Sequence, residues 1–158
     1  MSEAVDYRVN QASEAAIAEH LRRCDGDFVP PLSGRVEIDA YARKIAGKAT
    51  RFEAWAGDVL VGLVAAYCND HQRGIAYITS VSVLRGWTGR GIAGRLLDDC
   101  AKQASATGLR QVSLEVMRDN AAAIGLYSKN GFVAGKADGA FLDMDLYLDD
   151  GRKNEQRA

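Results

Sequence analysis

The sequence predicts an α/β fold: a mixed, mostly antiparallel sheet with helices on both faces and one parallel β-α-β crossover. Three observations predict it. The 158 residues suit one domain of ordinary size. Residues 51–84 hold three apolar segments separated by short polar turns, which is typical of an antiparallel meander. A helical repeat over 92–104 then leads to another apolar segment at 111–117, as in a β-α-β unit.

The N-terminal third is expected to form one short strand and two helices. Residues 5–9 are the expected strand, and Ser13 suits the cap of a helix over Ala15 to Leu21. Residues 26–34 hold two glycines and both prolines, so we expect a loop there. Helical spacing predicts a second helix over 37–48, on the apolar residues Ile38, Tyr41, Ala42 and Ile45.

Three consecutive strands are expected in the middle of the chain. Residues 51–56 and 59–67 flank a Gly57-Asp58 turn and predict a β-hairpin. A polar turn over 69–74 then leads to a third strand at 75–84.

The next part of the chain carries the crossover. Its helix has an apolar stripe at Ile92, Leu96, Cys100 and Ala104. Because such crossovers are right-handed, the strands at 75–84 and 111–117 are expected to be parallel neighbours. The turn between the first strand and the helix then lies at the carboxyl end of that strand, where mixed sheets bind ligands.

The last part of the domain is expected to hold a helix and two strands. Asn120 suits the cap of the helix, and Gly131 suits its end. Short strands are expected at 132–136 and 140–148, so that residues 1–148 form a single domain. The charged residues 149–158 are expected to be a flexible tail.

Composition excludes several classes of function. The chain has 20 Lys and Arg against 21 Asp and Glu, a net charge of −1, so no overall field attracts nucleic acid or an anionic membrane. Its three cysteines lie far apart and without metal-ligand spacing, which predicts no metal and a reducing cytoplasm. The first twenty residues carry no apolar run, so we expect no secretory signal. The longest apolar run, Val59 to Cys68, is too short to span a membrane.

The segment RGWTGRGIAGR, residues 85–95, carries the strongest chemical signal. It holds three arginines and no acidic residue. Glycines let the main chain turn tightly with exposed N–H groups, and a helix begins there with its positive end outward. The segment therefore predicts an anion site, and the anion that suits it best is a pyrophosphate. The alternative is an ordinary glycine-rich connection with solvated arginines.

The same turn fits the dinucleotide pattern GxGxxG through Gly89, Gly91 and Gly94. Glu115 even follows about twenty residues later, where an acidic residue is expected. The turn nevertheless follows an antiparallel meander, and too few residues remain for a two-lobed nucleotide fold. A nicotinamide or flavin site is therefore disfavoured.

The run ITSVSVLRGWTGRGIAGRLLDDC resembles the acyl-coenzyme A site of the GCN5-related N-acetyltransferases, the GNAT family. The family pattern Q/R-x-x-G-x-G/A falls on Thr88 to Ala93, with Gly91 at its fourth place; Thr88 departs from the usual Arg or Gln. The resemblance implies that main-chain N–H groups bind acetyl-coenzyme A as acyl donor. The residues that it implies for this binding are Val81, Val83, Thr88, Gly89, Arg90, Gly91, Ile92, Ala93, Gly94, Asn120 and Tyr127.

A second run, LEVMRDNAAAIGLYSKNGF at 114–132, is similar to the following family segment. It is nearest to the ribosomal-protein alanine N-acetyltransferases. The matching residues are Asn120, Ala123, Tyr127, Gly131 and Phe132. The resemblance implies that Tyr127 is the general acid that protonates the leaving thiolate; the alternative is a core tyrosine.

The general base has several candidates. By resemblance Glu115 is the base, and the alternative is a solvated carboxylate on a wet strand face. Other branches of the family use a glutamate at the position of Tyr77, and a tyrosine cannot replace it at neutral pH without a large shift of its pKa. Spare candidates that we expect to be solvated turn or strand residues are Glu53, Asp70 and His71; His20 is expected at the surface.

These observations predict an N-acetyltransferase that moves an acetyl group directly from acetyl-coenzyme A to a primary amine. The amine is expected to enter over the first two helices and residues 28–34, where no dense acidic patch occurs. A small amine, an amino sugar and a protein N-terminus all remain open as acceptors, and a homodimer is left open. The alternative functions are a non-catalytic acyl-coenzyme A sensor and a pure interaction domain.

Overall fold

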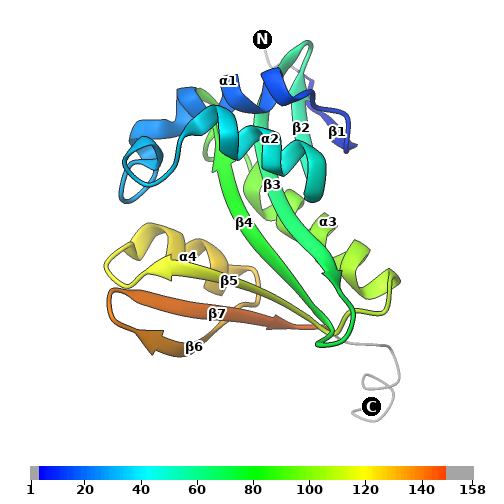
Figure 1. Ribbon diagram of the computed structural model, residues 1–158, viewed down its shortest axis with the longest axis vertical. Helices are drawn as coiled ribbons and strands as arrows, with labels where there is room; N and C mark the ends of the chain where they lie inside the picture. Colours follow the sequence, from blue (N-terminus) through cyan, green and yellow to red (C-terminus); the bar gives the residue numbers. More distant parts are fainter. Residues whose placement is uncertain (1–3, 149–158) are drawn as a thin grey trace.

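The computed structural model describes residues 4–148, which form a seven-stranded sheet flanked by helices (Figure 1). The sheet order is β1-β2-β3-β4-β5-β7-β6. The strands are β1 (Asp6–Val9), β2 (Thr50–Ala56), β3 (Val59–Asp70), β4 (Ile75–Val83), β5 (Gln111–Met117), β6 (Val133–Asp138) and β7 (Phe141–Tyr147). The helices are α1 (Glu14–Cys24), α2 (Ile38–Lys48), α3 (Ile92–Ala106) and α4 (Ala121–Lys129), with short 3-10 turns η1 (Asp25–Asp27), η2 (Leu32–Gly34) and η3 (Arg85–Trp87).

The predicted fold class is confirmed. Neighbouring strands among the described residues are antiparallel, except for the parallel pair β4 and β5. Helices α1 and α2 cover one face of the sheet, and α3 and α4 cover the other. The expected tail lies outside the described residues.

Strand β3 shows why the central strands are so apolar. Leu63 and Ala65 pack into the core under α1 and α2, whereas Val64 and Ala66 pack into the core under α3. With both faces covered, a strand has no wet side and reads as a continuous apolar run.

The turn between β3 and β4 is shorter than predicted. The polar residues Asn69 and Asp70 belong to β3, and Asp70 pairs with Ile75 across the hairpin. Asp70 Oδ1 also accepts a hydrogen bond from the Arg73 N–H at 3.1 Å. The predicted turn at 69–74 was therefore wrong at its start, because a polar side chain that closes a turn can still occupy a strand position.

The caps of the N-terminal helices match the chemistry expected of them. Ser13 Oγ accepts from the Ala16 N–H at 3.1 Å and starts α1, as predicted. The Glu37 carboxylate accepts from two N–H groups at the start of α2. Helix α1 runs to Cys24, three residues beyond the predicted end at Leu21, because Cys24 continues its buried stripe.

Candidate functional site

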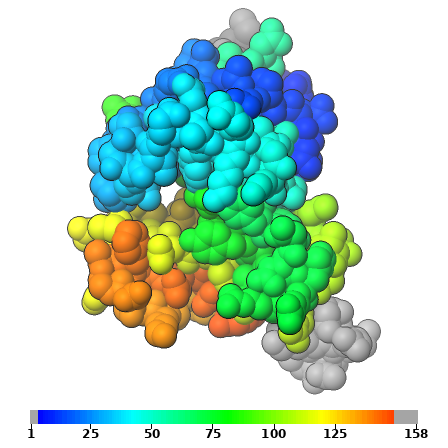
Figure 2. All heavy atoms as spheres, viewed as in Figure 1, coloured from blue at the N-terminus to red at the C-terminus, as the bar shows by residue number. Residues whose placement is uncertain are grey.

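The parallel pairing of β4 and β5 is short, and a cavity lies where it ends. The pairing runs only from Ile75↔Gln111 to Tyr77↔Ser113. Beyond it lies a cavity of about 630 Å³, lined by both strands, residues 87–94, α4 and the connection after α1. Figure 2 shows the molecule hollowed between the N-terminal helices and the C-terminal strands.

The edge of β4 offers free main-chain groups to this cavity. The Leu84 N–H donates to Val61 O at 2.8 Å. In an antiparallel pair the main-chain polar groups of every second residue point to the same neighbouring strand, so those of Ser82, two residues before Leu84, also point toward β3. Val81 and Val83 have the opposite phase, and both line the cavity. Their N–H and C=O groups therefore face the side from which β5 has diverged.

The glycine turn opens α3 with unpaired donors. Gly89 and Gly91 have φ of 78° and 79°, the left-handed region that glycine adopts without strain. Gly91 is the N-cap of α3 and makes no side-chain cap hydrogen bond. The first intrahelical bond runs from the Arg95 N–H to Gly91 O at 3.0 Å. The N–H groups of residues 92–94 precede it and have no intrahelical acceptor, so they are free to bind an anion.

The arginines around this turn are partly neutralised, which the sequence did not indicate. Arg85 pairs with Asp27 of η1, and Arg95 Nε lies 3.1 Å from Asp99 Oδ2. The Arg90 guanidinium lies 4.4 Å from the centroid of the Trp87 ring. Thus the helix start and Arg90 carry most of the remaining attraction for an anion.

Thr88 is used within the turn itself. Its Oγ1 donates to Arg85 O at 2.9 Å, and its N–H lies 3.4 Å from the same oxygen. Thr88 lines the cavity, but its polar groups already hold η3 in place. Its departure from the family pattern thus has a local structural role.

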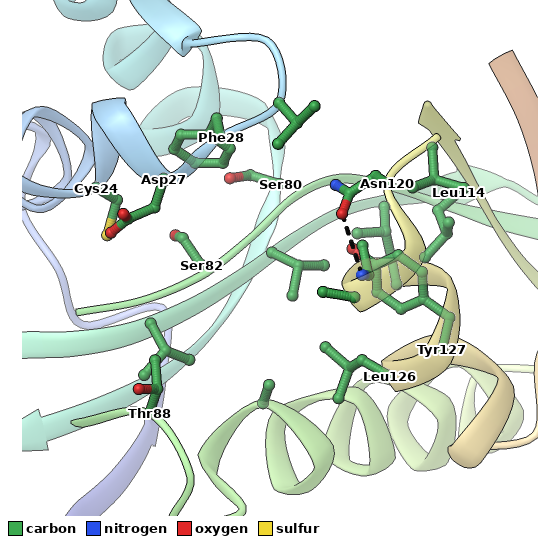
Figure 3. A pocket seen from close by; sticks show the side chains of 18 of the residues that line it. Cys24, Asp27, Phe28, Ser80, Ser82, Thr88, Leu114, Asn120, Leu126 and Tyr127 are labelled. Atoms are coloured by element: carbon green, nitrogen blue, oxygen red, sulfur yellow. Dashed lines mark hydrogen bonds between the residues drawn. The ribbon is translucent and has the colours of Figure 1, made fainter. Parts of the chain in front are cut away.

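Asn120, the N-cap of α4, and Tyr127, within α4, both line the wall of the cavity (Figure 3). Asn120 Oδ1 accepts from the Ala123 N–H at 3.2 Å, so the predicted cap is confirmed. The Tyr127 ring is 9% exposed and its centroid lies 5.9 Å from that of Phe132. Burial raises the pKa of Tyr127 to about 12, which keeps its phenol protonated at neutral pH.

Glu115 and Tyr77 differ in what they can do as bases. Glu115 lines the cavity on β5, and its side chain is exposed between buried Leu114 and Val116. Burial raises the pKa of Tyr77, and the nearby carboxylates of Glu115 and Asp143 raise it further. A raised pKa keeps the Tyr77 phenol protonated at neutral pH, which agrees with the prediction that Tyr77 is not the base.

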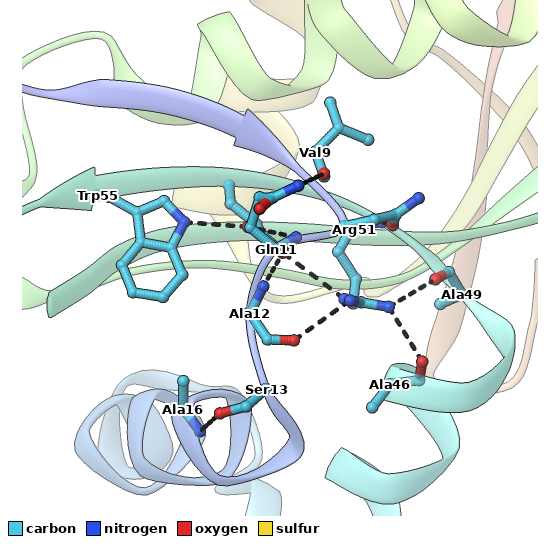
Figure 4. Close-up of polar contacts among 11 residues, drawn as sticks. Val9, Gln11, Ala12, Ser13, Ala16, Ala46, Ala49, Arg51 and Trp55 are labelled. Atoms are coloured by element: carbon cyan, nitrogen blue, oxygen red, sulfur yellow. Dashed lines mark hydrogen bonds and ion pairs between the residues drawn. The ribbon is translucent and has the colours of Figure 1, made fainter. Parts of the chain in front are cut away.

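Glu53 is not the solvated residue that we expected. Its side chain is fully buried, and its carboxylate accepts from the N–H groups of Gln11 and Ala12 and from Trp55 Nε1 (Figure 4). Arg51 Nε lies 3.6 Å away. The alternation in β2 indicated a wet face for Glu53, but α1 and α2 cover that face. Glu53 thus anchors the segment between β1 and α1 and lies outside the cavity.

Glu53→Gln is expected to destabilise the fold by about 3–5 kcal/mol, because it leaves the buried Arg51 without a counter-charge. The amide also sets an N–H group against main-chain N–H donors. Urea unfolding measures the change. Glu19→Gln is the control: it breaks only the exposed pair with Arg23 and should cost less than about 1 kcal/mol. Equal effects of the two substitutions would contradict the anchoring role of Glu53.

His20 also lies where we did not expect it. It is 2% exposed, with Nδ1 2.8 Å from Leu60 O and Nε2 2.8 Å from Ser82 Oγ. The signal was present in the sequence, because His20 falls at helical spacing within the buried stripe of α1, together with Ile17, Leu21 and Cys24. Burial lowers the pKa of His20 to about 4.

The buried His20 should make stability depend on pH. Its pKa is 6.5 when unperturbed and about 4 in the fold, so between these values the unfolded chain binds more protons. The contribution of neutral His20 to the free energy of unfolding is then fully present above pH 6.5. The free energy of unfolding falls by roughly 3 kcal/mol as the pH drops to 4. Urea unfolding at pH 7 and pH 4.5 measures this loss. His20→Gln should reduce it; an unchanged pH dependence would contradict the assignment.

The cavity has residues that sequence reasoning did not select. On the side of α1 and the connection after it they are Cys24, Asp27, Arg35, Ser80 and Ser82, beside Phe28 and Val29 of the expected segment 28–34. Asp70 and His71 lie in the hairpin between β3 and β4, away from this lining. Among residues 4–148, no three His, Cys, Asp or Glu side chains gather as metal ligands, and no helix is long and apolar enough to cross a membrane.

Comparisons with known proteins agree with this geometry. The family profile described as "Acetyltransferase (GNAT) family" matches residues 15–132. The N-alpha-acetyltransferase MAK3 of Arabidopsis thaliana is 32% identical over 77 residues, a match that covers 48% of this chain and only 40% of that relative.

Two solved structures show the shared fold. The PaiA N-acetyltransferase of Thermoplasma acidophilum, in complex with coenzyme A, has a TM-score of 0.73 and 18% identity, covering 92% of this chain and 99% of that chain. The ribosomal-protein-S18-alanine N-acetyltransferase of Escherichia coli has a TM-score of 0.71 and 17% identity, covering 90% and 94%. The profile match spans most of the sheet, the glycine turn and α4, and on it the chain belongs to the GNAT acetyltransferase family.

Proposed function

We propose that this protein transfers the acetyl group of acetyl-coenzyme A directly to a primary amine. The observation that carries the proposal is the set of unpaired N–H groups at the start of α3, beside the free edge of β4 and one continuous cavity. The proposal extends to a reducing, cytoplasmic location, supported by the free thiols of Cys24, Cys68 and Cys100.

The described residues fit the parts of acetyl-coenzyme A. The N–H groups of residues 92–94 would bind the diphosphate, with Gly89, Arg90 and Gly91 shaping and charging the turn, and Thr88 holding it. The edge at Val81 and Val83 would hold the pantetheine arm. The Asn120 amide, at the cap of α4, faces the same cavity. A side chain added at Gly89 or Gly91 would meet nothing within 4 Å, so the space above the turn is open.

Tyr127 would protonate the leaving sulfur. Acetyl-coenzyme A supplies a thioester, in which a C–N bond forms to the amine and the C–S bond breaks to release a thiolate. A phenol with a pKa of about 12 is fully protonated at neutral pH and donates a hydrogen bond toward that sulfur. Complete transfer of this proton is uphill, because a thiolate is a weaker base than a phenolate whose pKa is about 12. The hydrogen bond therefore stabilises the charge that develops on the sulfur as the C–S bond breaks, and a phenol that gives up its proton regains one from solvent.

Glu115 would accept the proton that the amine loses. The exposure of Glu115 supports an acceptor amine that is already partly neutral and depends little on a base. An α-amine is roughly 14% neutral at pH 7, whereas an ε-amine is roughly 0.04% neutral. A protein or peptide N-terminus is therefore the acceptor class that we place first.

Glu115→Gln should lower the rate most at low pH, where few acceptor amines are neutral and proton removal limits turnover. The pH–rate profiles of the parent and the variant measure this, with Asp70→Asn in the β3–β4 hairpin as a control outside the cavity. A profile identical to that of the parent would move the base to another residue.

An amine panel tests the function as a whole. Thiol release from acetyl-coenzyme A is followed with an alanine-terminated peptide, an N-blocked lysine peptide, a small alkylamine and an amino sugar, and products are identified by mass spectrometry. We expect acceptor-dependent release, greatest with the free N-terminus. Failure to bind acetyl-coenzyme A would contradict the proposal.

The second candidate is a non-catalytic acyl-coenzyme A sensor. Two observations favour it. Tyr77 lies at the position where other branches of the GNAT family have a glutamate that acts as the general base, and the side chain of Glu115 is exposed. Binding of acetyl-coenzyme A without release by any amine of the panel would select the sensor.

A further inference from the structure

His20 and Ser82 form a buried pair on the acceptor side of the cavity. His20 projects from α1 onto β3 and β4, where its ring nitrogens contact Leu60 O and Ser82 Oγ, each at 2.8 Å. Ser82 is 9% exposed and lines the cavity. Cys24 Sγ approaches the same Nε2 only to 3.7 Å, so the hydroxyl is its closer partner.

The contacts fix where the protons lie. Leu60 O is a carbonyl and can only accept, so His20 Nδ1 must carry a proton. The ring is neutral at pH 7 because burial lowers its pKa to about 4. In that neutral tautomer Nε2 has a lone pair and no proton. The Ser82 hydroxyl must therefore donate to Nε2, and its oxygen offers only lone pairs to the cavity.

Ser80 adds an independent sign of a ligand on this side of β4. It is 5% exposed and lines the same cavity, and its Oγ has no hydrogen-bond partner within residues 4–148. Figure 3 shows Ser80 and Ser82 on the side of β4 that faces Cys24, Asp27 and Phe28. A buried hydroxyl without a partner is costly unless a ligand completes it.

We infer that Ser82, held by His20 as a positioning residue, accepts a hydrogen bond from an N–H of the acceptor amine. The chemistry requires this direction. A neutral amine attacks through its single lone pair, so a hydroxyl that donated its proton to the nitrogen would block the attack. Because the Ser82 O–H donates to His20 Nε2, the amine can be bound through its own N–H groups and keeps its lone pair free. Ser80 lies two residues along the same strand and would accept from a second N–H of the acceptor.

This inference rests on the proposed acetyl transfer, and its test separates the two. Ser82→Ala should raise the KM for the best amine of the panel about tenfold, with the Kd for acetyl-coenzyme A changed less than about twofold. Ser82→Thr keeps the hydroxyl and should resemble the parent. Ser113→Ala is the matched control, since it removes a strand hydroxyl that donates to Asp145 outside the cavity.

Two substitutions of His20 test the positioning role. Glutamine can donate to Leu60 O and accept from Ser82, so His20→Gln should keep kcat/KM for the amine within about threefold of the parent. Leucine cannot accept, so His20→Leu should lower it about tenfold or more. Because both substitutions leave Ser82 in place, this pair tests the inference even if Ser82→Ala does not fold.

The outcomes are distinct. A parent enzyme that binds no acetyl-coenzyme A, or that acetylates no amine, contradicts the proposed function. An active parent whose Ser82→Ala variant keeps the parental KM overturns the inference alone. Equal activity of His20→Gln and His20→Leu likewise overturns it. If His20 has only a structural role, two variants of matched stability should be equally active, whether or not the new side chain accepts a hydrogen bond from Ser82.

Discussion

Tyr127→Phe is expected to lower kcat about 100-fold and to change the Kd for acetyl-coenzyme A less than about threefold. The substitution removes one hydroxyl from a ring that is 9% exposed and packs against Phe132. Phenylalanine keeps that ring packing, so the variant retains the wall of the cavity. What it loses is the proposed proton donor to the leaving sulfur.

Single-turnover rates and a binding titration measure the two quantities separately. Tyr7→Phe is the control, because that hydroxyl belongs to β1 and lies outside the cavity lining. If the Tyr127 variant turns over as fast as the parent, Tyr127 is a core residue and the acid is another group.

Gly91→Glu is expected to raise the Kd for acetyl-coenzyme A about 100-fold or more. Gly91 has φ of 79°, a conformation that costs a non-glycine residue about 1–2 kcal/mol. The new carboxylate would also stand beside the N–H groups proposed to bind the diphosphate, where it satisfies those donors itself and repels the ligand.

Two controls separate strain from charge at this position. Gly57→Glu places the same residue at a φ of 58° in the turn between β2 and β3, outside the cavity, and should keep the parental Kd. Gly91→Asn tolerates the left-handed conformation without adding charge, and should weaken binding much less than glutamate. Unchanged affinity of a folded Gly91→Glu variant would remove the diphosphate from this turn.

The parts of the site that the sequence predicted are those with local signals. The glycine turn, the Asn120 cap and the β-α-β crossover each follow from residue types at fixed spacing. The parallel pairing of β4 with β5 follows from handedness. These features determine where the free N–H groups lie, so the position of the candidate anion site was predictable.

The errors came from tertiary packing. Glu53 alternates with apolar residues in β2, which indicates a wet face, but α1 and α2 cover that face and pair the carboxylate with main-chain donors. His20 falls at helical spacing within the buried stripe of α1, but a single histidine is only weakly hydrophobic, so it was expected at the surface. The direction of the Ser82 hydroxyl depends on a contact across 62 residues, and no local pattern encodes it.

A crystal structure of this protein grown with acetyl-coenzyme A tests the central claim most directly. The claim predicts diphosphate oxygens within hydrogen-bonding distance of the main-chain nitrogens of Ile92, Ala93 and Gly94, with the acyl arm running along the edge of β4. A diphosphate seated elsewhere, or side chains filling the start of α3 while the ligand is bound, would contradict it.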